Sequence, residues 1–497
     1  MDILNNTVAV NFTGLKKYDD EVPFDPPENY PEYKGKGINP VNKIYAEVRE
    51  TFFQLGMDNG NYGSPDWNPF GEIVKPGMTV FIKPNTVRHY HLEHKEFFSI
   101  VIHPSILRPI LDYLCIALQD KGKIIIGDSQ VIFGEFDKAY KRAKIDLLLD
   151  WYREQTSIPI ECFDLRIVRG TRTWMYGKWG RKKVMQDPLG YSWVNFGEKS
   201  AFEGLDAKRF RVNIADPKVM YKHHSEGKHE YLIPNSLLSS DVIINIAKFK
   251  THRRTAVTLA QKNFVGIVAL EDTMPHYQIG SVSEGGDQYI NPSARKRLAV
   301  RLHDIIQSHP LVPVKFLAAL VKKIVWNSSA VMPFKDDIYE AMWYGNDTLW
   351  RLLQDLNRIV FYADNKGKLH DQPVRHQIVF MDGIIGGDKD GPVAPDPQYP
   401  GLLMAGYAPA AIDAVGSSIM GFDITKIPMI YKLMATSGGI MPLFHGAIDD
   451  IRIVEDGTEY NFKDFENIHN LHFEPHPNWK GHVEREEERM LEDELAV

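Results

Sequence analysis

The chain has 497 residues, of which 43% are hydrophobic and 25% charged, an ordinary composition for a soluble globular protein. This length exceeds what one hydrophobic core usually holds, so we expect two or three domains or one large α/β unit with insertions. The formal net charge of −7 argues against nucleic acid or an anionic membrane as a partner of the whole surface, so any anion binding must be local.

Cysteine content and hydropathy indicate the cellular compartment of the protein. The two cysteines, Cys115 and Cys162, are too few for a disulfide framework or for a four-cysteine iron–sulfur or zinc site. The start of the chain shows no signal peptide, and no apolar run reaches the roughly 18 residues of a spanning helix. The nearest run, 311–325, is interrupted by three lysines and predicts an amphipathic core helix rather than a membrane-surface helix. We therefore expect a cytoplasmic protein without membrane insertion.

Hydrophobic periodicity predicts the elements in chain order. The first 77 residues contain a strand at 8–12, a proline-rich extended segment at 19–40, a helix at 40–56 and a glycine-rich loop. A strand at 79–82, a helix at 105–120 and a strand at 124–126 then predict a βαβ unit of a parallel sheet. A helix at 139–152 and a strand at 158–163 follow.

The second half continues this alternation after an irregular or β-rich insertion at about 166–230. The expected strands are 241–246, 377–380 and 451–454, and the expected helices are 255–265, 293–309, 312–325, 347–362, 409–420 and 427–436. Loops are expected at 272–292 and 386–392, and an acidic tail at 484–494. The fold class is thus α/β, a central and mainly parallel sheet with helices on both faces. We divide it into 1–77, a core at 78–440, and 441–497.

Polar side chains follow four of the predicted strands. In open parallel sheets ligands bind outside the carboxyl ends of the strands, so these side chains are expected to converge on one cleft. The alternative is that strand ends are exposed and therefore polar. The four groups are Lys83 with Asn85, Asp128 with Ser129, Lys248 with Lys250 and His252, and Asp382.

Lys248 and Lys250 are two residues apart, so in an extended backbone they point the same way and suit a phosphate or carboxylate. Their mutual repulsion is expected to lower one lysine pKa toward the range of a general base. A solvated lysine pair is the alternative. His252 suits acid–base chemistry.

Two further groups extend the expected site. Lys262 and Asn263 belong to the following helix, whose amino terminus near Thr255 is expected to add partial positive charge for an anion. His276 lies in a glycine-containing loop that is interpreted as a lid with a catalytic group, or else as a plain surface loop.

Motifs for the common cofactors are absent from the sequence. It has no dinucleotide or P-loop glycine pattern, no zinc-protease motif and no serine-hydrolase elbow, so the cofactor is left unassigned. Asp128, Asp382, Asp388 and Asp390 with His252 suit a divalent cation by ligand type, but they lack a tight metal spacing, and no metal ligand is assigned.

The stretch 239–266, with its Asn245-x-x-Lys248-x-Lys250-Thr251-His252 and Lys262-Asn263-x-x-Gly266 pattern, resembles the domain-of-unknown-function 362 family. The segments 82–85, 103–104, 121–129, 382–392 and 412–421 match the same family in order and spacing, although Ile102 replaces its usual threonine. The resemblance implies a subgroup without the ferredoxin-like cysteines of many members. The segment 343–357 is similar to a subgroup associated with polysaccharide gene clusters. The family is also distantly similar to lactate-racemase-type domains, which use a strand-end histidine and lysine.

The sequence thus favours an enzyme that acts on a small anionic metabolite, phosphorylated or carboxylate and sugar-related. Its rival is a non-catalytic ligand-binding or assembly protein of polysaccharide biosynthesis. The expected catalytic residues are Lys250, His252 and Asp128. The expected substrate-binding residues are Lys83, Asn85, Ser129, Lys248, Lys262, Asn263, His276 and Asp382.

Overall fold

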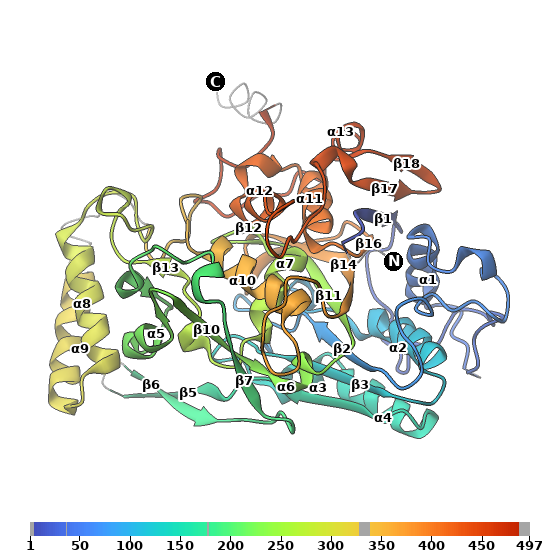
Figure 1. Ribbon diagram of the computed structural model, residues 1–497, viewed down its shortest axis with the longest axis horizontal. Helices are drawn as coiled ribbons and strands as arrows, with labels where there is room; N and C mark the ends of the chain where they lie inside the picture. Colours follow the sequence, from blue (N-terminus) through green and yellow to red (C-terminus); the bar gives the residue numbers. More distant parts are fainter. Residues whose placement is uncertain (1–3, 36, 176–177, 328–337, 487–497) are drawn as a thin grey trace.

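A computed structural model describes residues 4–35, 37–175, 178–327 and 338–486 (Figure 1). Within these residues eleven strands form one mixed, mostly parallel sheet in the order β18-β17-β1-β16-β14-β11-β2-β3-β4, with β12 and β15 paired to β11 and β14. The run from β14 to β4 is parallel throughout. This confirms the α/β class.

The strands of this sheet are β1 (Thr7–Phe12), β2 (Thr79–Pro84), β3 (Lys123–Asp128), β4 (Ile160–Asp164), β11 (Val242–His252), β12 (Ala256–Val257), β14 (His376–Asp390), β15 (Ala394–Gln398), β16 (Leu402–Gly406), β17 (Arg452–Glu455) and β18 (Thr458–Tyr460). The helices are α1 (Lys43–Gln54), α2 (Pro104–Leu118), α3 (Phe136–Arg142), α4 (Ile145–Gln155), α5 (Pro217–His223), α6 (Asn235–Leu238), α7 (Leu259–Asn263), α8 (Ala294–Ser308), α9 (Val312–Asn327), α10 (Leu349–Tyr362), α11 (Pro409–Met420), α12 (Pro428–Met434) and α13 (Phe462–Phe465).

Each face of the sheet carries its own hydrophobic core because side chains alternate along a strand. Ile243 and Ala247 of β11 pack with α7, α10, α11 and α12, whereas Val242, Ile244 and Ile246 pack with α1, α2 and α4. Helices therefore cover both faces, as expected from the sequence.

Two strands are longer than predicted. The strand expected to end at Ile246 continues as β11 to His252, and the expected loop 386–392 is largely the end of β14. Lysine, histidine and aspartate indicated a loop because such residues rarely enter a buried strand. Here the backbone stays paired, β11 with β14 and β14 with β15, although the register shifts between Lys248 and Lys250.

The helix after β11 is shorter than predicted. It begins at Leu259 rather than near Thr255, so no helix amino terminus lies at Thr255. The backbone N–H groups of Ala260 and Gln261 donate to the two carboxylate oxygens of Asp413, at 2.7 and 3.0 Å. This amino terminus is therefore satisfied by a protein carboxylate instead of a ligand.

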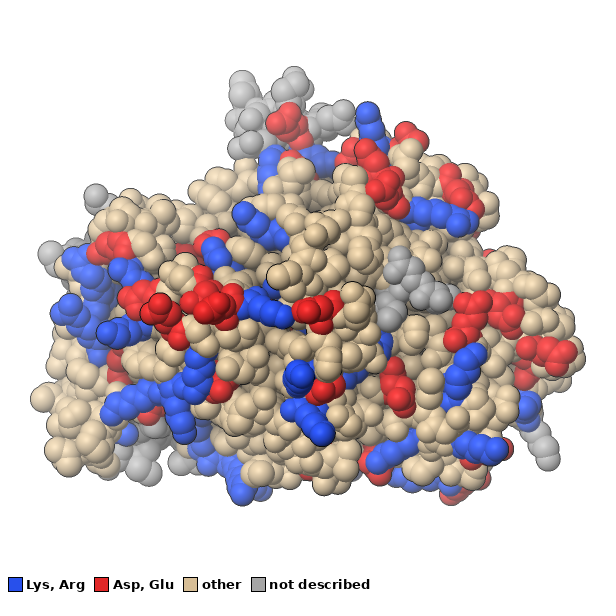
Figure 2. Space-filling model, in the orientation of Figure 1, with Lys and Arg blue, Asp and Glu red and all other residues tan. Residues whose placement is uncertain are grey.

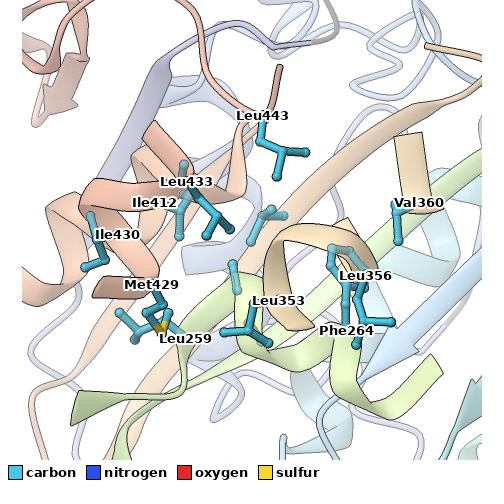
Figure 3. Packing of buried hydrophobic residues seen from close by; sticks show 14 of the residues in the cluster. Leu259, Phe264, Leu353, Leu356, Val360, Ile412, Met429, Ile430, Leu433 and Leu443 are labelled. Carbon is cyan, nitrogen blue, oxygen red and sulfur yellow. The ribbon is translucent and has the colours of Figure 1, made fainter. Parts of the chain in front are cut away.

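Packing holds α7 in place despite its short length. Figure 3 shows Leu259 of α7 and the adjoining Phe264 among Leu353 and Leu356 of α10 and Met429 of α12. A helix of five residues is not stable alone, so this apolar cluster fixes where Lys262 and Asn263 lie.

Other predictions were refined. The helix expected at 139–152 is two helices, because Lys144 adopts a left-handed backbone with φ of 60° between α3 and α4.

The insertion is β-rich, as expected. Its strands β5 (Val168–Met175) and β6 (Lys178–Lys183) pair with each other, and β7 (Tyr191–Asn195), β10 (Lys228–Pro234) and β9 (His224–Ser225) form a second small sheet. A further strand, β8 (Phe210–Arg211), pairs with β13 (Tyr277–Gln278). Most of the acidic tail, from residue 487, lies outside the described residues.

The ends of the chain join the central sheet. β1 pairs with β16 of the core on one side and with β17 of the carboxyl-terminal segment on the other. The division at residues 77 and 440 remains a prediction.

The run 311–325 forms α9, but the expectation of a core helix is wrong. Of the residues in α9 only Ala318 is buried, and the helix packs mainly against α8. Among the described residues no helix is both long and apolar enough to cross a membrane.

The capping of α7 gives a stability prediction. Asp413→Ala should lower the free energy of unfolding by about 2 kcal/mol, because two buried N–H groups lose their acceptor. Asp216→Ala, at the more exposed amino terminus of α5 where Asp216 accepts from Lys218, should cost only about 1 kcal/mol. Urea unfolding measures both, and equal losses would contradict a buried capping role for Asp413.

Candidate active site

A cavity of about 290 Å³ lies where β2, β3 and β11 end. It is lined by strand-end residues, by α7 and by loops from distant parts of the chain. Its charged lining is six basic side chains against two acidic ones, namely Arg88, Arg166, Lys250, Arg253, Arg254 and Lys262 against Asp128 and Glu271.

The structure brings most of the predicted site residues together. Those that line the cavity are Asn85, Asp128, Ser129, Lys250, His252, Lys262, Asn263 and His276. Lys83, Lys248 and Asp382 do not line it. All three are buried in ion pairs. Lys83 pairs with Asp128, which itself lines the cavity, and Lys248 pairs with Asp382.

Lys248 belongs to a separate buried cluster. Its Nζ lies 2.9 Å from Asp382 Oδ2 and donates to the Tyr18 hydroxyl at 2.8 Å, while that hydroxyl donates to Asp382 Oδ1 at 2.6 Å. The Lys250 ammonium group has other partners, so the two groups do not lie over one ligand as predicted.

Lys83 and Asp128 form the ion pair beneath the cavity. Lys83 Nζ lies 2.6 Å from Asp128 Oδ1, and Asp128 Oδ2 accepts from the N–H and hydroxyl of Thr86 at 3.0 and 2.6 Å. A Cβ on Gly266 would lie 2.2 Å from Asp128 Oδ1 and 2.8 Å from Lys83 Nζ. The pair thus requires glycine at position 266.

Asn263 connects α7 to two strands. Its Nδ2 donates to Asn245 Oδ1 at 2.7 Å and to the Lys83 carbonyl at 3.1 Å. Its Oδ1 accepts from Asn85 Nδ2 at 3.0 Å and from Lys83 Nζ at 3.2 Å. Both polar ends of this amide are satisfied, so Asn263 is placed to hold the site together.

Lys250 is buried, and no carboxylate in the described part of the chain contacts it. Its Nζ donates to Asn85 Oδ1 at 3.0 Å and to the carbonyls of Ile100 and Pro392 at 2.8 and 3.4 Å. Burial, followed by the positive charge of Lys248, holds the lysine pKa well below its ordinary value. The geometry favours a neutral amine or an ammonium group that faces an anion.

Lys262 is the least satisfied cation of the cavity. It is 9% exposed, and its ammonium group makes no hydrogen bond or ion pair with any residue that the structure describes. Burial, with a smaller contribution from Arg254, lowers the pKa of Lys262 to about 7.

The two cavity histidines are held in opposite tautomers. His252 Nδ1 accepts from the backbone N–H of Arg254 at 3.1 Å, so the neutral ring carries its proton on Nε2. His276 Nδ1 lies 2.8 Å from the Met274 carbonyl and must donate to it, which leaves Nε2 unprotonated. Burial lowers both pKa values, that of His276 to about 3. One ring therefore offers a donor and the other an acceptor.

The sequence missed several lining residues. Glu271 is half-buried, and burial followed by the charge of Asp272 raises its pKa to about 7. Arg254 donates to the Glu340 carbonyl at 2.8 Å and to Asn213 Oδ1 at 2.9 Å. Arg254 is two residues after His252 and was therefore close to the predicted site in the sequence. No sequence pattern around Glu271, Arg88 or Arg166 indicates that these residues reach the same cavity.

The donor set does not suit a metal ion. Among the described residues no group of three or more histidine, cysteine, aspartate or glutamate side chains is placed to hold one. Asp382 pairs with Lys248, and Asp390 lies 2.9 Å from Arg253. Both cysteines are free thiols.

Comparison with known families agrees with the resemblance seen in the sequence. Residues 190–418 match the family described as Domain of unknown function (DUF362). The match contains β11, α7 and the whole of β14 but neither β2 nor β3. Comparison with curated proteins and with solved structures gives no match.

The low pKa of Lys262 predicts a pH dependence of stability. Its pKa falls from 10.5 to about 7 on folding, so between these values the unfolded chain binds more protons, and Lys262 makes stability rise with pH. Lys262→Met should therefore be more stable than wild type near about pH 7. The difference should shrink by up to about 1.4 kcal/mol per pH unit toward about pH 9.

Urea unfolding over this pH range measures the difference. Lys141→Met, at an exposed position of α3, is the matched control and should show no such pH dependence. A constant difference between Lys262→Met and wild type would contradict the lowered pKa.

Proposed function

Since the chain carries a DUF362 domain at residues 190–418, a type of domain without an assigned activity, we propose that it is an enzyme for a small anionic metabolite. The observation that carries the proposal is the buried Lys262 side chain, whose ammonium group has no hydrogen-bond or ion-pair partner among the described residues and which lines the cavity together with two neutral imidazoles of opposite tautomer.

Charge balance supports an anionic ligand. A buried cation is costly unless an opposite charge or several hydrogen bonds offset the loss of water. Lys83 and Lys248 have such partners in Asp128 and Asp382, whereas Lys250 has neutral acceptors alone. An anion in the cavity would contact Lys262 and reduce the cost of burying both lysines.

The size of the cavity supports a small metabolite. Its volume of about 290 Å³ lies at the lower end of the range for small-molecule sites. The similarity of 343–357 to a subgroup from polysaccharide gene clusters makes sugar acids and sugar phosphates the first compounds to test. The two free thiols fit a reducing compartment, so we place this activity in the cytoplasm.

The imidazoles suit acid–base catalysis. His276 Nε2 would accept a proton from the bound metabolite, and His252 Nε2–H would donate one to it. Glu271, with a pKa raised to about 7, is a further proton carrier. Asp128 would act through Lys83 and Thr86 as a positioning residue, because its oxygens are already bonded to them.

Anion binding is the first test. Isothermal titration with glucuronate, glucose 1-phosphate and inorganic phosphate should detect binding of at least one of them, and none of uncharged glucose. Lys262→Met should weaken that binding by at least roughly tenfold, because a charge-assisted hydrogen bond is lost. Lys141→Met should bind like wild type. Binding that is unaffected by Lys262→Met would contradict this site.

Proton transfer is the second test. With the compound that binds, or with a metabolite that native mass spectrometry finds bound to the purified protein, NMR in deuterated water should show exchange of a carbon-bound hydrogen. His276→Gln should slow this exchange by roughly 10²–10⁴-fold while binding persists. Tight binding without any exchange or turnover in the wild type would favour the rival function, a non-catalytic ligand-binding or assembly protein.

A further inference from the structure

Helices α8 and α9 form a hairpin at the edge of the molecule, on the left in Figure 1. The two helices pack on each other through a small apolar cluster that contains Leu302, Ile306 and Ala318. The hairpin is fixed to the body by Arg211, which lies 2.7 Å from Asp304 of α8. It is therefore held at a set position rather than folded into either core of the sheet.

One side of α9 is apolar and exposed, and Phe316 and Leu320 on this side also line a hollow with Ile306 of α8 and with Tyr339 and Glu340. Val312, Phe316, Leu320 and Ile324 follow one another at intervals of four residues and lie on one side of the helix. Phe316, Leu317, Leu320 and Ile324 are 55, 60, 48 and 62% exposed. Single exposed apolar residues are common, but a continuous row of this kind marks an interaction surface.

The charge of the hairpin is opposite to that of the chain. Residues 294–327 contain seven lysines and arginines and one acidic residue, Asp304, whereas the whole chain has a net charge of −7. One of the seven, Lys296, is buried, and the other six are at least partly exposed. Figure 2 shows basic side chains gathered on the left of the molecule, where Figure 1 places the hairpin.

We propose that the α8–α9 hairpin docks the protein on an anionic phospholipid surface, a role beyond the proposed activity. Apolar side chains on one face of a helix enter the headgroup region, and lysine and arginine around them contact the anionic lipids. The absence of a spanning helix among the described residues fits a helix that lies in the interface.

Charge selects the lipid surface over a second copy of the chain. In a symmetric dimer through this hairpin the same basic patch would face itself. Like charges brought together in an interface oppose association. An anionic bilayer supplies both the apolar layer and the opposite charge.

Vesicle flotation with the full chain tests the proposal. The protein should float with vesicles of phosphatidylcholine and phosphatidylglycerol but much less with phosphatidylcholine alone, and added salt should weaken binding. Phe316→Ser with Leu320→Ser should reduce the bound fraction by at least roughly tenfold. Lys315→Ser with Lys323→Ser should reduce it at low salt.

The matched control replaces exposed apolar residues elsewhere. Leu147 of α4 and Ile440 are 50 and 62% exposed, and Leu147→Ser with Ile440→Ser should bind vesicles like wild type. Thermal unfolding verifies that each variant is folded. The proposal is overturned if wild type fails to float with anionic vesicles or if the α9 variant floats equally well. A dimer in sedimentation velocity that the α9 variant abolishes, without vesicle binding, would assign the hairpin to a second copy instead.

Discussion

The buried ion pair between Lys83 and Asp128 is the interaction on which the site depends. It joins the ends of β2 and β3, and Asn263 ties the same lysine to β11 and α7. Two buried charges are retained only when both are paired and hydrogen-bonded, and Thr86 and Asn263 complete that requirement. Gly266 lets α7 and the turn after it approach closely enough for this contact. The spacing of the Lys-Asn-x-x-Gly stretch in this chain thus has a structural reason, independent of the chemistry in the cavity.

The same region separates two kinds of lysine. Lys83 and Lys248 have carboxylate partners and are parts of the framework, whereas Lys250 and Lys262 contact no carboxylate of the described residues and line the cavity. Sequence spacing alone suggested that all four would hold the ligand. The placement of Asp128 and Asp382 distinguishes the two kinds of lysine. A lysine whose charge is already balanced by a buried carboxylate attracts a further anion only weakly.

The sequence was sufficient for the α/β class and for the parallel strands β2, β3, β4, β11 and β14, but it did not predict β12, β15, β16 or β18. Apolar strands ending in polar groups are a local pattern, and parallel pairing brings such ends together, as Asn85, Asp128 and Lys250 show. The extent of β11 was not predictable, because burial of Lys248 and Lys250 rests on Tyr18, Asp382, Ile100 and Pro392, which are far away in the chain. Glu271 was missed for the same reason, since its raised pKa comes from burial that only the folded chain creates. The core assignment of α9 failed because its lysine and leucine pattern shows an amphipathic helix without showing what covers its apolar side.

Hydrogen bonds among the described residues connect the hairpin to the cavity. Lys322 of α9 donates to His303 Nδ1 at 3.0 Å, so His303 Nε2 must donate to the Asn213 carbonyl, 2.9 Å away. Asn213 Oδ1 in turn accepts from Arg254, which lines the cavity and which, after burial, contributes to the lowered pKa of Lys262. The position of α9 and the position of the Arg254 guanidinium are therefore not independent. One end of this chain of hydrogen bonds is Lys322, in the hairpin that is proposed to bind the lipid surface. The other end is Arg254, in the ligand cavity.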